Sequence, residues 1–510
     1  MTFDQHLSRR TMLGALGGLG AALLAGCSGP TDTATGRLPR SPGATSTRRA
    51  TRTGPVTVRS WAADRGSPFY IAHRGAGDVY PEHSLPSYRA AVEMGAPCLE
   101  VSVNMTSDGV LICMHDLSYD RTTTGRGFVA DQPSSVLAGI GIRQPQLGPA
   151  WVQKPLPRVP RLEQVLAEFG GKVVICLEAK DDKAYPSMMA MVARFNLLDS
   201  VIVKAYYSSV RIQQAKAAGL PVFAYLSPAD MNEPTIATAA ARLDRNDLLV
   251  LPADNGDYVT YYPDALIDSA KAHGVPLLVY PIHRRADAEH YFRLGVSGAV
   301  SSDYGYTSTN TAAATSDNWA SKRISSGEKP KMPDSRSLAG AWTSVNEFTL
   351  GAEGDRQFVT LGQLCPIAAA ASQYRLRFSA AWNRLPADPS ATVSLAFCHL
   401  DDRYYEDGLS LNEGYHATMS PDGTLRLYRH SASAPDELLG EARTPPVQAG
   451  EWASLRLDVS PQSLIWRRAD LPDTEQVVVH DSAVRGGYLA IGRSSADQRA
   501  ALALREFSVG

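Results

Sequence analysis

Short apolar runs alternate with amphipathic stretches between residues 67 and 306 of this 510-residue chain. The runs are rich in β-branched residues, which favours strands, and several of the amphipathic stretches end at a glycine, as helices often do. Eight such strands alternating with helices predict a closed (β/α)8 barrel, a TIM barrel of the α/β class, over residues 61–306. The predicted strands are Phe69–Ala72, Cys98–Val103, Val173–Glu178, Val201–Lys204, Val222–Tyr225, Leu248–Pro252, Leu277–Tyr280 and Gly298–Ser301. The helices predicted with them include Leu85–Met94, Leu162–Phe169, Asp264–Ala272 and Ala286–Leu294.

Residues 117–157 are too long a segment for one barrel loop. They predict an insertion after the second strand, with a short hairpin and a loop over the barrel mouth. Ile140, Ile142 and Trp151 are its candidates for an exposed apolar rim, although the same side chains can pack on the barrel.

A different pattern follows a Ser-, Thr- and Ala-rich linker at residues 307–338. Residues 339–510 carry short alternating runs separated by turn signals such as Pro421-Asp422-Gly423, which predicts an all-β jelly-roll sandwich. The closing segments, Gly486–Arg493 and Ala503–Val509, resemble the last strands of laminin-G and concanavalin-like domains. A glycan or a wall polymer is therefore a candidate ligand of this domain.

The first residues read as a targeting segment. Arg9-Arg10 followed by an apolar run resembles a twin-arginine export signal, and Leu24-Ala25-Gly26-Cys27 resembles the box at which bacterial lipoproteins are cut. Residues 1–27 are thus predicted to be a signal peptide, and residues 28–60 a disordered tether. The predicted location is extracytoplasmic, on the cell membrane, through a lipid on Cys27.

The amino-acid composition is ordinary and excludes few classes of protein. A hydrophobic fraction of 44% and a charged fraction of 20% are typical of a folded water-exposed protein. The net charge of −2 and the lack of a basic run with aromatics exclude a dedicated nucleic-acid surface. With Cys27 lipidated, five cysteines remain, of which Cys365 and Cys398 are candidates for a disulfide.

Candidate chemistry follows two of the apolar runs. His73-Arg74 comes directly after the first strand, and His115-Asp116 ends a second apolar run. Strand ends deliver side chains to the mouth of a barrel, where one histidine can remove a proton and the other can supply one. An arginine fork beside them suits a phosphate ester. His83, His273, His283 and His290 have no such context and are predicted to be surface residues.

These residues form part of an ordered set of motifs that resembles the glycerophosphodiester phosphodiesterase family. The matching segments are His73-Arg74-Gly75-Ala76, Pro81-Glu82, Glu100, Thr106-x-Asp108-Gly109, His115-Asp116, Asp120-Arg121-Thr122-Thr123, Pro160-Arg161-Leu162-Glu163, Leu177-Glu178-Ala179-Lys180 and, with serine at 297 and 302, Gly295–Asp303. The resemblance covers about half of the chain.

The resemblance implies a metal-dependent hydrolysis of glycerophosphodiesters to glycerol 3-phosphate and an alcohol. It implies His73 and His115 as the acid–base pair, and Arg74 and Lys180 as contacts of a small-molecule phosphodiester. It also implies a Ca²⁺ or Mg²⁺ ion among carboxylates, because hard cations prefer oxygen ligands. The available ligands are Glu82, Glu100 and Glu178.

Two positions depart from the family pattern. Where the family has Glu-x-Asp, this chain has Glu100-Val101-Ser102, so that Ser102 is at best a weak ligand and a lower metal affinity is expected. Where the family often has Ser-Phe, this chain has Lys204-Ala205. Lys204 either points into the mouth as a further phosphate contact or extends past the barrel rim.

Other functions stay open at this point. The same barrel could cleave a phospholipid, or a glycerol-phosphate polymer of the wall-teichoic type. A protein of another class, a catalytically degenerate surface binding protein, would also explain Ser102. The intact set of histidines, Arg74, Glu100, Glu178 and Lys180 argues against that reading.

Overall fold

The computed structural model describes residues 54–144, 147, 151, 154–255, 260–309, 340–344, 347–350, 356–360, 373–402, 413–431, 433–471, 475–494 and 499–510. The predicted signal peptide, most of the tether and most of the linker lie outside these residues, so export and lipidation at Cys27 stay predictions. The first helix, α1 (Val58–Asp64), begins inside the segment predicted as a tether. Its Trp61 is buried, so the folded region starts earlier than the sequence indicated.

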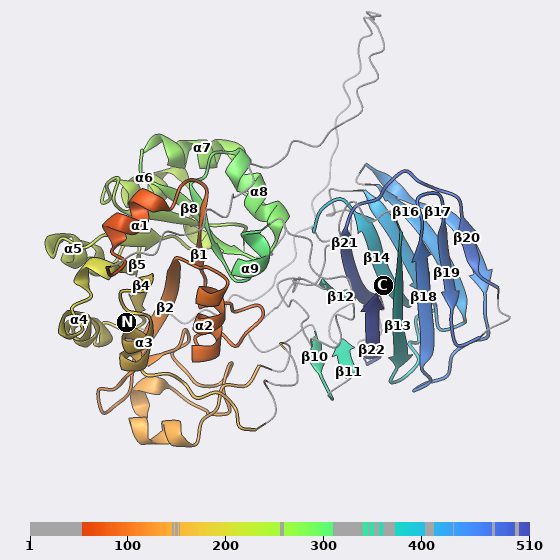
Figure 1. The fold of residues 1–510 in the computed structure, drawn as a ribbon, viewed down its shortest axis with the longest axis horizontal. Coiled ribbons are helices and arrows are strands. Elements are labelled where there is room, and N and C mark those ends of the chain that lie inside the picture. Colours follow the sequence, from red (N-terminus) through yellow and green to blue (C-terminus); the bar gives the residue numbers. More distant parts are fainter. Residues whose placement is uncertain are drawn as a thin grey trace, which may run out of the picture. The chain divides into compact units, whose positions relative to one another are not determined.

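Eight parallel strands close into a barrel, as predicted (Figure 1). Closure is complete because β1 pairs with both β9 and β2. The strands are β1 (Phe69–Ala72), β2 (Cys98–Met105), β4 (Val174–Ala179), β5 (Val201–Tyr206), β6 (Val222–Tyr225), β7 (Leu248–Pro252), β8 (Leu277–Ile282) and β9 (Gly298–Ser301). They read as continuous apolar runs because helices cover them outside and a core fills them inside.

Helices surround the barrel, and α1 closes its amino-terminal end. Inside that end, Trp61 packs edge-on against Phe69 at 5.4 Å in one hydrophobic cluster with Ile71, Cys98 and Phe223. The other helices are α2 (Leu85–Glu93), α3 (Leu162–Phe169), α4 (Ala184–Arg194), α5 (Val210–Ala217), α6 (Glu233–Ala240), α7 (Asp264–Ala272), α8 (Arg285–Arg293) and α9 (Tyr304–Thr307), with short 3-10 turns at η5 (Leu198–Ser200) and η6 (Pro228–Asp230). This apolar cluster fills the amino-terminal end of the barrel, so polar side chains of the interior lie toward the carboxyl ends of the strands.

An additional strand, β3 (Leu111–Cys113), precedes the predicted insertion and is antiparallel to β2. The insertion itself contains an antiparallel bridge between Ser118 and Phe128 and two 3-10 turns, η1 (Val129–Asp131) and η2 (Ser134–Ala138). Ile140 and Ile142 are buried in a small cluster of the insertion with Tyr119 and Val129, so they form no exposed rim. Trp151 is half-buried and packs edge-on against Tyr80.

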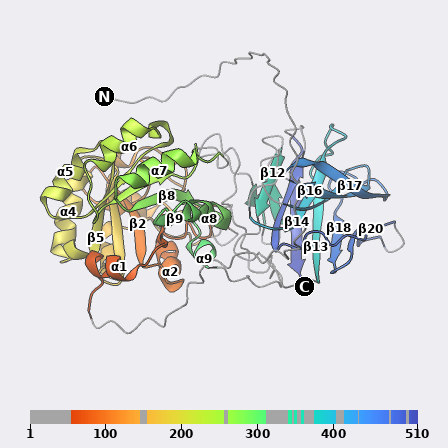
Figure 2. The same ribbon diagram turned by 90° about the horizontal axis from the view of Figure 1, so that it is seen from above.

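The C-terminal region consists of two antiparallel sheets, which confirms the all-β prediction (Figure 2). One hydrophobic cluster contains residues of both sheets, among them Phe378, Phe397 and Trp466, and this is the packing of a sandwich. The first sheet has the order β10 (Gly340–Trp342), β11 (Glu347–Leu350), β22 (Leu502–Val509), β13 (Tyr374–Trp382), β18 (Ala453–Val459), β19 (Leu464–Arg468), β20 (Val477–Val479). The second has the order β12 (Arg356–Thr360), β21 (Tyr488–Ser494), β14 (Thr392–His399), β15 (Gly414–Met419), β16 (Thr424–Ser431), β17 (Ala434–Arg443).

Two further expectations concern single features of the chain. Cys398 is buried beside the Tyr374 hydroxyl, which lies 3.0 Å from its Sγ atom. Cys365 lies outside the described residues, so its pairing with Cys398 stays a prediction. No helix in the described part of the chain is long and apolar enough to cross a membrane.

Candidate active site

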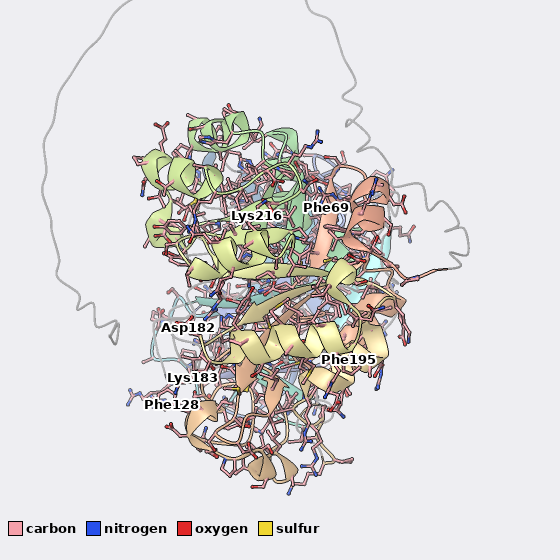
Figure 3. The ribbon with its side chains drawn as sticks, turned by 90° about the vertical axis from the view of Figure 1, so that its left-hand side faces the viewer. Phe69, Phe128, Asp182, Lys183, Phe195 and Lys216 are labelled. Carbon is pink, nitrogen blue, oxygen red and sulfur yellow. The ribbon has the colours of Figure 1, made fainter. Side chains whose placement is uncertain are left out.

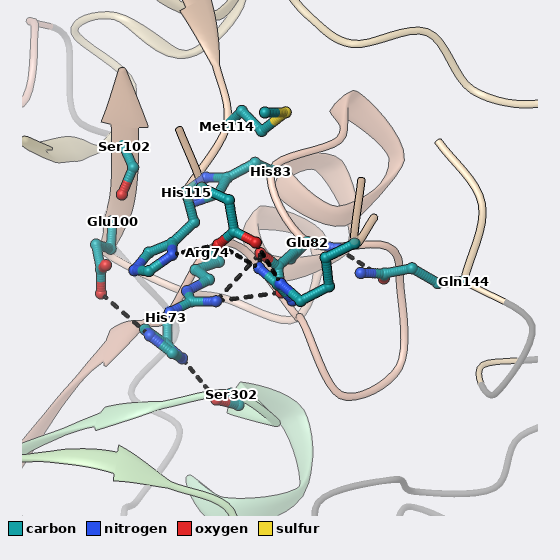
Figure 4. A network of polar contacts seen from close by, with 12 residues as sticks. His73, Arg74, Glu82, His83, Glu100, Ser102, Met114, His115, Gln144 and Ser302 are labelled. Atoms are coloured by element: carbon teal, nitrogen blue, oxygen red, sulfur yellow. Dashed lines mark hydrogen bonds and ion pairs between the residues drawn. The ribbon is translucent and has the colours of Figure 1, made fainter. Parts of the chain in front are cut away.

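Polar side chains gather at the carboxyl ends of the parallel strands β1, β2, β4 and β5 and in the segment after β3, at the mouth of the barrel (Figure 4). Both histidines of the predicted acid–base pair belong to this group, with Arg74 from the loop after β1. Every residue predicted for the site lies there: His73, Arg74, Glu82, Glu100, Ser102, His115, Glu178, Lys180 and Lys204.

His73 is held by the turn that follows β1. Arg74 and Gly75 both have positive φ, 53° and 90°, which bends the chain sharply after the strand. A Cβ atom at Gly75 would lie 2.5 Å from Ser87 Oγ, so the close approach also requires glycine. Ser302 directly follows β9, the strand that pairs with β1, and its Oγ lies 2.7 Å from His73 Nδ1. The ring is thereby fixed with Nε2 directed toward Glu100, whose Oε2 is 3.9 Å away.

His115 is held from the opposite side of the site. Its Nδ1 lies 2.9 Å from Asp116 Oδ1, and an ionised carboxylate there makes Nδ1 the donor. The neutral ring then presents the lone pair of Nε2, toward which Lys180 Nζ points at 3.5 Å. Asn104 fixes this segment by donating to the carbonyl oxygens of Met114 and Asp116 at 2.8 and 3.0 Å. Asn104 therefore orients the histidine loop.

Arg121 connects the two histidine segments. Its Nη1 and Nη2 donate to both oxygens of Glu82 at 2.9 and 2.6 Å, and its Nε donates to Asp116 Oδ2 at 2.6 Å. Arg74 Nη1 reaches the same Glu82 carboxylate at 3.1 Å. Burial alone would raise the pKa of Glu82, but the charges of Arg121 and Arg74 outweigh burial and lower it far below its ordinary value. The Glu82 carboxylate is thus engaged by two arginines.

The contact of Arg74 with Glu82 leaves other donor groups of the guanidinium unused. Its Nε atom is buried and has no hydrogen-bond partner in the described part of the chain. The guanidinium is held in place by Glu82 through Nη1, so its position is fixed before any ligand binds. A fixed cation with a spare N–H group is suited to a phosphate oxygen.

Lys204 lies inside the site, and its side chain is only 7% exposed, so it does not extend past the rim. Its contact with a phosphate stays a prediction. Nζ lies 2.8 Å from Glu100 Oε1 and 2.9 Å from Glu178 Oε2, and 4.8 Å from the centre of the Tyr225 ring. Burial alone would lower the pKa of Lys204, but Glu100 and Glu178 reverse the effect and raise it. Lys204 is a buried cation shared by two carboxylates.

Glu178 has further partners that use its remaining acceptor positions. Ser102 Oγ donates to Oε2 at 3.3 Å, and the Tyr225 hydroxyl donates to Oε1 at 2.9 Å. Lys180 Nζ donates to the same Oε1 at 3.2 Å. Ser102 is paired with Glu178 in the register of β2 and β4, so its hydroxyl faces this carboxylate.

The described side chains do not fit the predicted Ca²⁺ or Mg²⁺ site. Glu82 is bound by two arginines, Ser102 adds no charge, and an ammonium group already bridges Glu100 and Glu178. In the described part of the chain, three side chains bring possible metal-ligand atoms within 4.8 Å of one another in the C-terminal sandwich. They are His416, His430 and Asp436. Glu82, Glu100 and Glu178 form no such cluster.

Both catalytic candidates are neutral in the free site near pH 7. Burial and the charge of Arg74 outweigh the hydrogen bond to Asp116 and together lower the pKa of His115 to about 4. Burial, Arg74 and Lys204 lower the pKa of His73 well below its ordinary value. Because Arg74 acts on both rings, an anion bound at Arg74 would raise both pKa values.

Acid is expected to destabilise the protein partly through His115. Its pKa is about 4 in the folded chain and 6.5 as an ordinary histidine, so above pH 6.5 both states are neutral. Below pH 6.5 the unfolded chain binds the proton first, and this stability is lost as the pH falls toward 4. Between pH 7 and pH 5 the loss is about 2 kcal/mol. Urea unfolding at both values should show a loss that is about 2 kcal/mol smaller in His115→Asn than in the wild type, because other buried histidines such as His73 still contribute. Equal losses in the two proteins would contradict the assignment.

Two histidines were placed wrongly by sequence reasoning. His83 is 1% exposed, with Nδ1 2.7 Å from the Tyr88 hydroxyl, and His283 lies with Nδ1 2.6 Å from Asp78 Oδ2. His273 is exposed as predicted and His290 is half-buried. Sequence reasoning also missed Arg121 as the bridge and Ser302 as the partner of His73. The Asp120–Thr123 motif and a hydroxyl residue in the closing motif were the available signals.

Comparisons with known proteins give one family. Residues 73–305 match the model of the "Glycerophosphoryl diester phosphodiesterase family". A glycerophosphodiester phosphodiesterase of Bacillus subtilis (strain 168) is 29% identical over 45% of this chain and 81% of its own length. One of Caldanaerobacter subterraneus is 28% identical over 46% and 93%. Among solved structures, a putative glycerophosphoryl diester phosphodiesterase from Silicibacter pomeroyi covers 49% of this chain and 96% of its own, with 21% identity and a TM-score of 0.41.

Proposed function

We propose that this chain hydrolyses glycerophosphodiesters to glycerol 3-phosphate and an alcohol, because residues 73–305 match the model of the glycerophosphoryl diester phosphodiesterase family and its curated relatives carry that name. The observation that carries the proposal is the arrangement of two neutral imidazoles, His73 buried and His115 half-buried, around one arginine. His73, His115 and Arg74 come from two separate strand ends, and each is held by its own partner. A phosphodiester is a substrate that uses all three groups.

The phosphate is bound by cations. Arg74, which Glu82 fixes through Nη1, supplies one positive charge, and Lys180, next to His115 Nε2, supplies a second. Burial lowers the pKa of Lys180, and Glu178 offsets only part of that effect. In a site closed to water, such fixed charges stabilise the negative charge that grows on the phosphate oxygens during attack.

The two histidines exchange protons with the substrate. One imidazole takes the proton of the attacking hydroxyl, either water or a neighbouring glycerol hydroxyl, as its oxygen bonds to phosphorus. The other, protonated because the bound anion raises its pKa, gives its proton to the alcohol oxygen as the P–O bond breaks. Attack by a glycerol hydroxyl gives a cyclic phosphate. Water then opens this ring, and the two histidines exchange roles: the former acid takes the proton of water and the former base returns its proton to the glycerol oxygen. Asp116 and Ser302 keep both rings oriented throughout.

The first test follows glycerol 3-phosphate released from glycerophosphocholine by the purified full chain. Release at a rate well above the buffer blank, proportional to enzyme, is expected. His273→Ala is a matched control, because His273 is exposed at the end of α7 and is not one of the site residues. No release from glycerophosphocholine, glycerophosphoethanolamine or a glycerol-phosphate polymer would reject the proposal.

A second candidate substrate is a glycerophospholipid with an acyl chain. The observation that favours it is a pair of exposed apolar side chains in the insertion, Leu117 at 50% and Phe128 at 60% exposure. Leu117 follows Asp116 directly, and its carbonyl accepts from the Val129 amide at 2.8 Å, next to Phe128. Figure 3 shows Phe128 at the surface of the protein. In the same assay, a lysophospholipid turned over faster than glycerophosphocholine, with the advantage lost in Phe128→Ser, would support this substrate class.

The predicted location completes the proposal. Export through Arg9-Arg10 and a lipid on Cys27 would place the reaction outside the cytoplasm, at the cell membrane. Recovery of the protein in the membrane fraction, and its release into the soluble fraction by Cys27→Ala, tests this part. A glycan ligand of the C-terminal sandwich stays a prediction.

A further inference from the structure

We propose that the Lys204 ammonium takes the place of a divalent cation, so that this site works without a metal ion. The family generally uses a divalent metal. In this chain, two inward-facing carboxylates, Glu100 and Glu178, hold a lysine amine at 2.8 and 2.9 Å. The statement about ion binding stands on this geometry alone, whereas the statement about turnover rests on the proposed function.

The charges of the site are already matched without an ion. The four carboxylates, Glu82, Glu100, Asp116 and Glu178, are paired with the four cations Arg74, Arg121, Lys180 and Lys204. A divalent cation added here would bring two uncompensated charges into a buried site, which is costly.

The position between the carboxylates is also taken. Ca²⁺ binds oxygens at 2.3–2.6 Å and Mg²⁺ at 2.0–2.1 Å. An ion bridging Glu100 Oε1 and Glu178 Oε2 would therefore compete with Lys204 Nζ for the same lone pairs, while the Tyr225 hydroxyl and Lys180 use Oε1 of Glu178. Ser102, which donates to Glu178, supplies no third carboxylate.

The two departures from the family pattern have one common explanation. Ser102 in place of aspartate removes a negative charge, and Lys204 adds a positive charge within reach of the same two carboxylates. Either change alone would leave the charges of the site unbalanced, whereas both together keep it neutral. Lys204 thus neutralises Glu100 and Glu178 so that an anionic phosphodiester can approach.

The lysine is built into the barrel so that it cannot leave easily. Lys204 is an inward residue of β5, paired in register with Phe223 of β6, and its amine lies over the Tyr225 ring at 4.8 Å. An aromatic face stabilises an ammonium that has left bulk water. A buried lysine with two carboxylate partners keeps its proton, which agrees with the raised pKa.

The test has two readouts that do not depend on each other. Full-length wild type is dialysed against EDTA and then against chelator-free buffer, and its metal content and its heats of titration with CaCl₂ and MgCl₂ are measured. No ion binding is expected at millimolar concentration. The double variant Ser102→Asp/Lys204→Ser restores a third carboxylate and removes the amine, and we expect it to bind one Ca²⁺ or Mg²⁺ ion. A purely structural role of Lys204 would not create such a site.

The second readout is turnover. Wild-type release of glycerol 3-phosphate should be unchanged by EDTA, and Lys204→Met should lower kcat/KM by at least about 100-fold in EDTA. Lys172→Met is the matched control. Lys172 is exposed and lies just before β4 begins, at the amino-terminal end of the barrel, whereas the site lies at the carboxyl end. Circular dichroism establishes that each variant is folded.

The outcomes separate this inference from the proposed function. Wild-type Ca²⁺ or Mg²⁺ binding that Glu100→Gln abolishes, or activity lost in EDTA and restored by either ion, would overturn it. If no substrate is cleaved, the proposed function fails, yet absent binding in the wild type together with gained binding in the double variant would still support the exchange of ion for lysine. A double variant that folds and binds no ion would count against it.

Discussion

Alanine in place of His73 or His115 should lower kcat by about 10³-fold, because each imidazole moves one of the two protons of the reaction. Both rings are preoriented, His73 by Ser302 at 2.7 Å and His115 by Asp116 at 2.9 Å. Both histidines are neutral in the free site, so the charges that attract the anionic substrate there are those of Arg74 and Lys180. The loss should therefore appear mainly in kcat, with KM changed by a small factor. Steady-state kinetics on glycerophosphocholine measures both.

The double variant sharpens this test. If the two histidines act in the same step, the variant lacking both should be little slower than either single variant, because the second loss removes a group that no longer functions. His273→Ala should keep full activity. A single His73 or His115 variant that retains more than about a tenth of wild-type kcat would remove that residue from the acid–base pair.

Arg121→Met should destabilise the barrel by about 3–5 kcal/mol, the usual cost of breaking a buried ion pair from one side. Arg121 donates to Glu82 and Asp116 together, and its side chain and that of Glu82 are 19% and 11% exposed. Without it, Asp116 keeps only its contact with His115, and Glu82 keeps only Arg74. Activity should fall as well, since Asp116 then orients His115 less firmly. Urea unfolding gives the change in stability.

The same loop provides the control for this substitution. Arg126 lies five residues further on and is 79% exposed; its Nη1 lies 3.8 Å from the Asp120 carboxylate and donates to the exposed Asp120 carbonyl oxygen at 3.2 Å. An exposed pair of this kind contributes little, so Arg126→Met should change the free energy of unfolding by less than about 0.5 kcal/mol. If Arg121→Met were as stable as Arg126→Met, the bridge between the two histidine segments would have no structural importance.

The fold was largely predictable because the barrel strands carry a strong local signal. β1, β6, β7 and β9 have the predicted bounds, and the other four strands agree to within two residues at each end. Parallel strands buried on both faces are unbroken apolar runs, so each can be found without knowing its neighbours. The insertion was predicted less well, since its Ile140 and Ile142 pack in a small cluster that only the folded segment creates.

The site was predictable where its residues follow strand ends in order, as His73-Arg74 and His115-Asp116 do. It was not predictable where function depends on partners remote in the sequence. Ser302 and His73 are 229 positions apart, and Lys204 and Glu100 are 104 positions apart. The burial of His83 was not predictable either, because it depends on a turn: the backbone at His83 has φ of 54°, which directs the side chain into the interior against Tyr88.

The sequence by itself determined the order of the strands, the two histidines, the arginine beside the first of them and the departures at Ser102 and Lys204. These are local facts, set by residue type and by the period of the apolar pattern. Only the tertiary structure decided that Lys204 occupies the space between Glu100 and Glu178, because barrel closure fixes which inward side chains of β2, β4 and β5 meet. The physical reason is that charges select their partners by distance in space, and in a barrel that distance is set by the register of neighbouring strands.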